Sequence, residues 1–319
     1  MCARPSRYQK HCAHGLPGEQ NFLLPRRLAG LGRPGPDHGQ RQPTVATTEP
    51  VTVKRLLCQL IAGLLSCGLL VPAWAQGLQT VLLVSIDALH PAALRADVAP
   101  NLEQLKQPGQ FTLDGHSVTP PQTLIAHTAM LTGLSPEQSG KRDNAWKPGQ
   151  TQVTHKTLLD IAVDQGFATA YFYAKPKLGY LVTPSISTHA LARDDGVERA
   201  QAFLRQPGRR LVFLHLSGLD EAGPDSGWLS GPYLDELRYL DRSLAPLLAD
   251  VRQRGRYLIV LTSDHAGHDR LHGTADPQDF LLPVLVQASR PLPGIVRDEF
   301  SLVGLKAMVL DAMARLNKD

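Results

Sequence analysis

The stretch RYLIVLTSDHAGHDRLHG, residues 256–273, joins an apolar run directly to a cluster of acidic and imidazole side chains. Its first part, from Tyr257 to Leu261, is a short and continuous apolar run, which is typical of a strand buried on both faces. Asp264 follows almost at once. Because ligand sites in parallel sheets lie beyond the carboxyl ends of the strands, this segment predicts both a sheet and the edge of that sheet where chemistry takes place.

Two other segments have the same form. TVLLVSID (80–87) ends in Asp87, and RRLVFLHLS (209–217) is followed by Asp220. Apolar runs alternate with helical patterns along the chain, which predicts an α/β fold with a mainly parallel central sheet and helices on both faces. We expect strands at 80–87, 111–118, 167–174, 209–217, 256–264 and 281–288, and helices at 100–107, 123–133, 155–166, 194–208, 231–255 and 301–316.

The side chains after the run at 256–264 favour a metal site. Any single acid at a strand end also suits a helix cap or a turn. Here, however, Asp264, His265, His268 and His272 fall within nine positions. Carboxylate and imidazole ligands together suit a divalent transition metal, Zn²⁺ first. We treat His268 and Asp269 as bystanders or as residues that support the ligands.

Thr123 opens the helical pattern TLIAHTAMLTG after Pro120 and Pro121. The free N–H groups and the dipole at a helix start favour an anion. A threonine hydroxyl is a poor nucleophile unless a metal or a base activates it. Thr123 is therefore either a plain helix cap or, with a metal beside it, a nucleophile.

Composition limits the class of protein. The chain has 319 residues, of which 43% are hydrophobic and 19% charged, and this excludes a disordered tail, a collagen-like repeat and a multispan membrane protein. The net charge of +4 is uneven, because nine of the 33 Lys and Arg but only three of the 29 Asp and Glu precede residue 76. The body, residues 76–319, therefore offers no basic surface for nucleic acid.

The N-terminal part has the pattern of an export signal. Lys54 and Arg55 precede an apolar run from 56 to 71, and the Ala-x-Ala box at 73–75 precedes Gln76. We expect residues 1–52 to be a non-native or disordered extension, 53–75 to be a signal peptide cleaved between Ala75 and Gln76, and 76–319 to be the mature domain, periplasmic or secreted and without a membrane span. A membrane anchor and a lipoprotein acceptor at Cys67 are the alternatives, and a true start near residues 51–53 would explain the extension.

Four separated blocks carry a family resemblance. VLLVSIDAL, PQTLIAHTAMLTGLSPEQSGKRDN, GLDEAGPDSGWLSGPYL and TSDHAGHDRLHGTADPQDFLLPVLV occur in this order between about 80 and 288. They resemble the type I phosphodiesterase/nucleotide pyrophosphatase family of the alkaline phosphatase superfamily. The resemblance implies an alkaline-phosphatase-like core, a two-zinc site and a covalent phosphothreonine mechanism.

The resemblance also implies a ligand set. By position in the family's motifs, one metal would be held by Asp87, Asp264, His265 and the nucleophile Thr123. The other would be held by Asp220, His272 and a histidine four residues after Asp220, where this chain has Pro224. Either Asp225 or Glu221 substitutes for that histidine, or the second metal binds weakly, or catalysis is impaired.

Three further residues are assigned by resemblance. Asn144 matches the asparagine that hydrogen-bonds a phosphoryl oxygen, and Lys175 and Lys177 resemble the paired lysines of relatives that cleave monoesters and phosphonates. Without the resemblance, Asn144 is an ordinary turn residue and the lysines belong to a solvated loop.

The resulting prediction is an exported, metal-dependent hydrolase of small-molecule phosphoesters or phosphoanhydrides, of the phosphodiesterase/nucleotide pyrophosphatase type. A phosphomonoesterase or phosphonate hydrolase is one alternative, and a degenerate, non-catalytic phosphate- or metal-binding relative is another.

Overall fold

The computed structural model describes residues 77–108 and 110–318, so the predicted extension and signal peptide lie outside the described residues. Within the described part, no helix combines the length and the apolar character needed to cross a membrane. A single eight-stranded sheet organises this part, with strand order β4-β3-β5-β1-β6-β7-β2-β8. The strands are β1 Thr80–Ile86, β2 Phe111–His116, β3 Ala168–Tyr173, β4 Thr188–Leu191, β5 Arg210–Leu216, β6 Tyr257–Thr262, β7 Leu281–Ala288 and β8 Phe300–Ser301.

The sheet is mainly parallel, as predicted. Strand β1 pairs in parallel with β5 on one side and with β6 on the other. Among the eight described strands, β7 alone runs against its neighbours β6 and β2. Because β1 is buried along its whole length, it reads as a continuous apolar run rather than as an alternating one.

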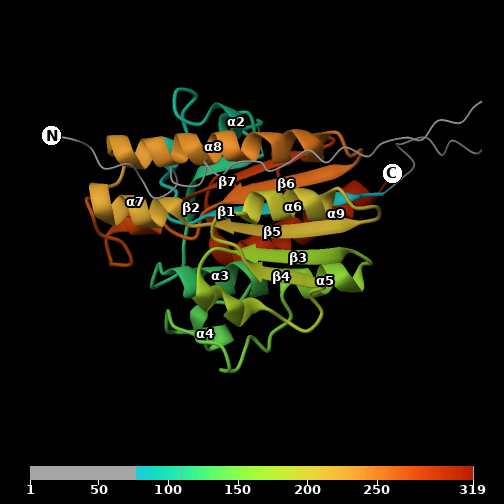
Figure 1. Cartoon of the computed structure of the whole chain (residues 1–319), viewed down its shortest axis with the longest axis horizontal. Coiled ribbons are helices and arrows are strands. Elements are labelled where there is room, and N and C mark those ends of the chain that lie inside the picture. The colour runs from blue at the N-terminus through green and yellow to red at the C-terminus, as the bar shows by residue number, and fades with distance from the viewer. Residues whose placement is uncertain (1–76, 109, 319) are drawn as a thin grey trace, which may run out of the picture. The chain divides into compact units, whose positions relative to one another are not determined.

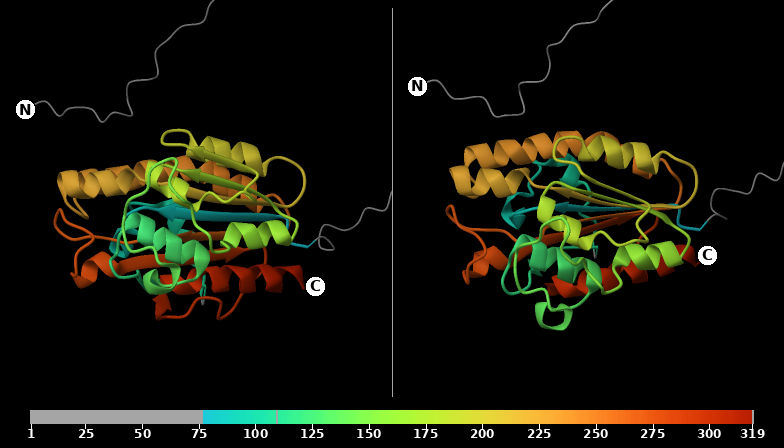
Figure 2. Two further views of the ribbon diagram at one scale, coloured as in Figure 1. Left: turned by 90° about the horizontal axis from the view of Figure 1, so that it is seen from below. Right: turned by 60° about the horizontal axis from the view of Figure 1, so that its bottom comes forward.

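Helices cover both faces of the sheet, which Figure 2 shows from the side. On one face, α3, α5 and α9 pack over Val81 and Leu83 of β1; on the other, α2, α6, α7 and α8 pack over Leu82 and Val84. The α-helices are α2 Pro100–Glu103, α3 Thr123–Thr132, α4 Pro136–Ser139, α5 Leu158–Asp164, α6 Gly196–Leu204, α7 Gly218–Ser226, α8 Gly231–Arg252 and α9 Leu305–Asn317. Short 3-10 helices lie at η3 Pro91–Ala93, η4 Pro176–Leu181, η5 Pro277–Phe280 and η6 Leu302–Gly304.

Several elements differ from the sequence prediction. The helix expected over 100–107 ends at Glu103, and the chain continues in tighter turns, in which the Leu105 N–H bonds to the Leu102 carbonyl and the Lys106 N–H to the Glu103 carbonyl. Helices α4 and α7 and strands β4 and β8 were not expected at all. The sequence of α7, GLDEAGPDS, contains two glycines and a proline, which are poor helix formers.

Candidate active site

The predicted acidic residues meet at one edge of the sheet. Asp87 follows β1, Asp220 lies in α7 just after β5, and Asp264 and His265 follow β6. These three neighbouring strands are parallel, so their carboxyl ends lie together (Figure 1). Lys175 follows β3, the next parallel strand along the sheet.

A sharp bend after β1 brings Asp87 and Asp264 together. Ala88 adopts a left-handed backbone conformation with φ of 63°, which costs a non-glycine residue energy and is sustained only by surrounding contacts. Its N–H donates to Asp264 Oδ1 at 3.2 Å, and its carbonyl accepts a hydrogen bond from the Tyr233 hydroxyl at 2.7 Å. The bend therefore ties the ends of β1 and β6 to α8.

Thr123 is the first residue of α3, a helix that is buried along its length and ends at Gly133 in the left-handed region. The N-cap residue, Gln122, makes no side-chain capping hydrogen bond. Instead, Asn144 Oδ1 accepts a hydrogen bond from the Leu124 N–H at 2.9 Å. Asn144 thus stands directly beside the helix start.

Lys175 lies among the acids rather than in solvent. Its Nζ is 2.6 Å from Asp87 Oδ2, 2.5 Å from Asp220 Oδ2 and 3.1 Å from Thr123 Oγ1. Lys177 lies one step away, with its Nζ 3.1 Å from Asn144 Oδ1. Two ammonium groups therefore face the hydroxyl of Thr123 and the start of α3 from the same segment.

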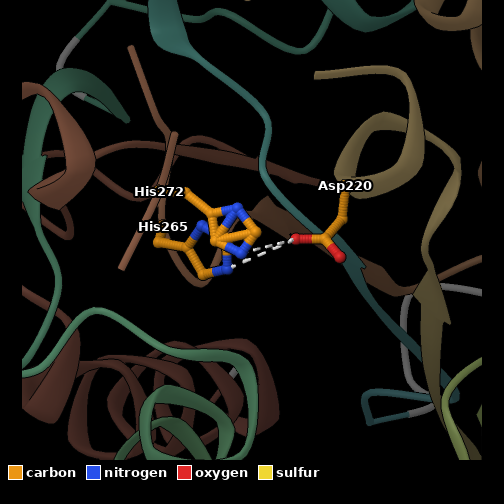
Figure 3. Close-up of side chains that lie close together, drawn as sticks. All are labelled: Asp220, His265 and His272. Atoms are coloured by element: carbon orange, nitrogen blue, oxygen red, sulfur yellow. Dashed lines mark ion pairs between the residues drawn. The ribbon is translucent and has the colours of Figure 1, made fainter. Parts of the chain in front are cut away.

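Two groups of potential metal ligands occur among the described residues. In each, the ligand atoms lie within 4.8 Å of one another. The first group is Asp87, Asp264 and His265, all fully buried, and the second is Asp220, His265 and His272. Figure 3 shows the second group, in which the two imidazoles stack with Asp220 opposite them.

The donor atoms of the first group fit a small divalent cation. His265 Nε2 lies 3.5 Å from both Asp87 Oδ1 and Asp264 Oδ2. Donors around a tetrahedral Zn²⁺ at about 2.0–2.1 Å lie about 3.3–3.4 Å apart. All three atoms are buried and have no hydrogen-bond partner among the described residues. Since buried polar atoms normally have a hydrogen-bond partner, these three unpaired ligand atoms favour a bound cation.

The charged groups of this cluster lie so close together that they shift one another's pKa values. Burial opposes ionisation of Asp87, but the Lys175 ammonium and the His215 imidazole hold the pKa of that carboxyl well below its usual value. Burial raises the pKa of Asp220 to about 6, and the charge of Asp87 acts in the same direction. Burial also opposes the charged form of Lys175, yet the carboxylates of Asp87 and Asp220 raise the pKa of this lysine above its usual value. Lys175 is therefore a cation at neutral pH.

His272 is a neutral imidazole at physiological pH. Burial lowers its pKa to about 4, with the neighbouring His265 acting in the same direction. A neutral imidazole is the form that binds a metal.

Two buried histidines that the sequence did not nominate support the site. His215 Nδ1 accepts a hydrogen bond from the Ala174 N–H at 3.2 Å, so its Nε2 carries the proton and donates to Asp87 Oδ2 at 3.0 Å. His127 Nδ1 donates to the Thr123 carbonyl at 2.8 Å, and its Nε2 accepts from the Ser85 hydroxyl at 2.9 Å. Burial lowers the pKa of His127 to about 4 and keeps it neutral. The only sequence signal for His215 is its place near the end of a strand.

His268 and Asp269 lie outside both ligand groups, as expected. His268 Nδ1 instead lies 2.8 Å from Asp279 Oδ1, and this contact holds the loop against η5. The Asp269 carbonyl accepts a hydrogen bond from the Trp228 N–H at 2.8 Å.

The substitutes considered for the missing histidine do not join the second group. Pro224 lies inside α7, one helical turn after Asp220. Glu221 and Asp225 are exposed and belong to neither ligand group.

Residues 81–283 match the model of the family described as type I phosphodiesterase/nucleotide pyrophosphatase, a segment that contains every residue of both ligand groups. The chain belongs to this family. Membership confirms the family predicted from the four sequence blocks. The family is one of phosphoester-acting enzymes, as the sequence predicted.

Solved structures share the fold. The C-terminal periplasmic domain of EptC from Escherichia coli, solved with Zn, has a TM-score of 0.56 and 16% identity and covers 75% of this chain and 83% of its own. The corresponding domain of the phosphoethanolamine transferase EptC from Campylobacter jejuni has a TM-score of 0.55 and 13% identity over 76% of this chain and 92% of that one. A protein of the alkaline phosphatase superfamily from Vibrio parahaemolyticus has a TM-score of 0.53 and 13% identity, with 76% and 68% covered. These likenesses confirm the predicted alkaline-phosphatase-like α/β core.

Among characterised proteins, a phosphopentomutase from Acetivibrio thermocellus is 26% identical over 152 residues, which are 47% of this chain. The chain spans about 38% of the length of that relative. The likeness therefore concerns part of the relative only.

Proposed function

We propose that the chain is a divalent-metal-dependent phosphoester hydrolase in which the Thr123 hydroxyl is the nucleophile. The observation that carries this proposal is the position of Thr123. Its hydroxyl lies at the start of a buried helix, 3.1 Å from Lys175 Nζ, and that ammonium also contacts Asp87 and Asp220 of the two ligand groups. Family membership supports the same chemistry.

The residues that would hold a metal are Asp87, Asp264, His265 and Thr123, with Asp220 and His272 as ligands for the second ion that the family resemblance implies. A divalent cation there, Zn²⁺ first, supplies a Lewis acid that eases loss of a proton from a hydroxyl or from water and stabilises negative charge on phosphoryl oxygens. The identity and the number of the ions stay predictions.

The chain's own residues account for the rest of the reaction. Thr123 loses its proton to water, and its oxygen forms a bond to phosphorus. The P–O bond to the leaving group then breaks, and the leaving oxygen keeps the electron pair and takes a proton. Water hydrolyses the phosphothreonine, which restores the hydroxyl and releases the phosphoryl product. Lys175, a permanent donor at 3.1 Å, stabilises negative charge on the Thr123 oxygen.

Asn144 is placed to bind a phosphoryl oxygen. Both of its contacts, from the Leu124 N–H and from Lys177 Nζ, use the side-chain oxygen Oδ1. This leaves its amide hydrogens to donate to a substrate. The start of α3 adds the N-terminal end of a helix dipole, which favours an anion.

The family supports a phosphodiester or pyrophosphate as the small-molecule substrate. Lys177 favours a phosphomonoester as the second candidate. Its ammonium lies beside Asn144 and is a second positive charge in addition to that of Lys175. A terminal phosphate carries one more negative charge than a diester. A second cation matches that extra charge.

The same proposal includes export. Two of the structures that share the fold are described as periplasmic domains. This supports the reading of residues 53–75 as a signal peptide, and sequencing the N-terminus of the exported protein tests cleavage between Ala75 and Gln76.

The nucleophile is tested with the purified protein, bis-p-nitrophenyl phosphate, p-nitrophenyl phosphate, and Zn²⁺ or EDTA. We expect turnover that depends on metal, and Thr123→Ala to lower kcat at least 1,000-fold while the circular dichroism spectrum stays unchanged. Thr123→Ser keeps a hydroxyl and should retain part of the activity. Wild-type turnover by Thr123→Ala would refute the nucleophile, and no turnover of either ester would favour the non-catalytic alternative.

A further inference from the structure

The two ligand groups share one atom. His265 Nε2 lies 3.5 Å from Asp87 Oδ1 and from Asp264 Oδ2 in the first group, and 3.7 Å from Asp220 Oδ1 in the second. His265 Nδ1 lies 2.8 Å from the Ala266 carbonyl and therefore carries the proton. Nε2 then has a single lone pair, which serves one metal ion and not two.

Without His265 the second group is incomplete. It retains Asp220 Oδ1 and His272 Nε2, which lie 3.6 Å apart. Pro224, one turn after Asp220, has no donor atom in its side chain. Two protein ligands are fewer than the three that catalytic zinc sites typically have.

A lysine supplies positive charge between the two groups. Lys175 Nζ contacts Asp87 and Asp220 through their Oδ2 atoms, whereas the Oδ1 atoms belong to the ligand groups and have no hydrogen-bond partner among the described residues. The carboxylates thus divide their oxygens between an ammonium and a metal site. Three carboxylates, with Asp264 as the third, are balanced by one divalent ion and one ammonium.

We propose that this centre holds one tightly bound divalent ion, on Asp87, Asp264 and His265, and that the Lys175 ammonium takes the place of a second ion beside Thr123. The inference rests on the proposed function, because it assigns Lys175 a role toward the nucleophile of that reaction. It differs from the two-zinc centre that the family resemblance implies. The reason is specific to this chain: one expected ligand is Pro224, and a lysine contacts the carboxylates of both groups.

Zinc stoichiometry tests the proposal independently of turnover. The purified full chain is loaded with Zn²⁺ alone, dialysed against metal-free buffer and analysed by mass spectrometry for metal per chain. We expect one equivalent for the wild type and two for the double variant Lys175→Met/Pro224→His, which removes the competing charge and restores a ligand. Two equivalents retained equally tightly by the wild type, or none, would overturn the proposal, and so would a double variant that folds and still binds one.

Variants of Lys175 distinguish the effect of its positive charge from that of its side-chain volume. Lys175→Met should keep one zinc and lose at least 100-fold in kcat, whereas Lys175→Arg should recover part of that loss because it keeps the positive charge. Lys156→Met is the matched control, since Lys156 is exposed and pairs with Asp164, and neither residue belongs to a ligand group; it should change neither zinc content nor turnover. Wild-type kcat in Lys175→Met would contradict the role of the ammonium.

The two proposals fail in different ways. A protein that binds one zinc, gains a second in the double variant and hydrolyses no phosphoester would refute the proposed function and leave the metal count intact. A protein that turns over esters with two firmly bound zinc ions would do the reverse.

Discussion

Asn144 has two separable roles at the scale of single residues. As an acceptor it satisfies the Leu124 N–H at the start of α3, and as an amide donor it is free to bind substrate. Replacement by alanine removes both roles, whereas replacement by aspartate keeps the acceptor and removes the donor. The pair of variants therefore distinguishes a capping residue from one that binds substrate.

We expect Asn144→Ala to destabilise the protein by about 1 kcal/mol, because it leaves a helix N–H without its partner. Asn144→Asp should keep wild-type stability, since its carboxylate still accepts from Leu124 and Lys177, but it should lower kcat about 100-fold through loss of a donor to the transition state. Urea unfolding and steady-state kinetics measure the two effects. Unchanged kcat in Asn144→Asp would show that Asn144 caps α3 and does not bind the substrate.

The sequence was most informative where a polar residue follows an apolar strand. Asp87, Asp264 and His265 were found for that reason, and the structure brings them within contact distance of one another. His215 was not found, because a strand covered on both faces carries no alternating pattern to show which way a side chain points. The contact of Lys175 with Asp87 and Asp220 joins residues that follow different strands, and spacing along the chain cannot give such a distance.

At the scale of elements, Trp228 packs between α7 and the loop that carries His265 and His272. Its ring lies 5.6 Å from the imidazole of His272, and it packs over Gly223 in α7 and over Gly267 in the loop. A Cβ at Gly267 would lie 2.4 Å from the Trp228 ring and 2.6 Å from the Leu271 carbonyl. Both distances are far below van der Waals contact, so the loop that carries His265 and His272 has to move if this position gains a side chain.

Gly267→Ala should therefore weaken Zn²⁺ binding at least tenfold and destabilise the protein by about 1–3 kcal/mol, which is typical of overpacking. The matched control is Gly231→Ala at the start of α8, where the added Cβ would meet no described atom within 4 Å apart from its chain neighbours and the backbone of its own helix. Isothermal titration with Zn²⁺ compares the variants. Equal affinity in Gly267→Ala and the control would contradict the idea that Trp228 positions the loop.

Asp160 links α5 to the segment at 183–185. Its Oδ2 accepts hydrogen bonds from the N–H and the hydroxyl of Thr157, both at 2.7 Å, and its Oδ1 accepts from Thr183 and Ser185. Burial opposes ionisation, but these hydrogen bonds outweigh it and lower the pKa of Asp160. A carboxyl with a lowered pKa in the folded state stabilises the fold above its unfolded pKa and loses this effect as the pH falls through its folded pKa.

Asp160→Asn should destabilise the protein by about 1–3 kcal/mol at pH 7, because the amide mismatches several donors. The difference from the wild type should shrink as the pH falls below the ordinary carboxyl value of 3.8. Urea unfolding at pH 7 and near pH 3 measures it. Asp164→Asn is the control, since Asp164 makes an exposed ion pair with Lys156 that contributes little. A pH-independent difference would contradict the assignment.

Some elements were not predictable from sequence for a physical reason. The run LLPVLVQA is apolar except for Gln287, so it predicts a buried strand without its direction, and β7 runs antiparallel to its neighbours. Strand β4 has four residues at the sheet edge and alternating exposure, which gives too short a pattern to recognise. In contrast, the long apolar periodicity of α8 predicted that helix closely.

At the scale of the whole molecule, the two groups of potential metal ligands join parts of the chain that are distant in sequence. Their residues come from the ends of β1 and β6, from α7 and from the loop that carries His272. Without a cation, three carboxylates lie close together with one lysine among them, and their mutual repulsion opposes folding. A ligand that binds the folded state alone raises its stability by mass action.

Zn²⁺ should therefore raise the thermal midpoint of the metal-free protein. At a free concentration 100 times the dissociation constant, the gain is about 2.7 kcal/mol, which for a domain of this size corresponds to about 5–11 °C. Differential scanning calorimetry with EDTA or Zn²⁺ measures it. Asp264→Asn should abolish the shift, because it removes the charge of a buried ligand, whereas Asp311→Asn in the exposed i,i+4 pair of α9 should preserve it. An equal shift in wild type and Asp264→Asn would mean that zinc stabilises the protein from somewhere other than this edge of the sheet.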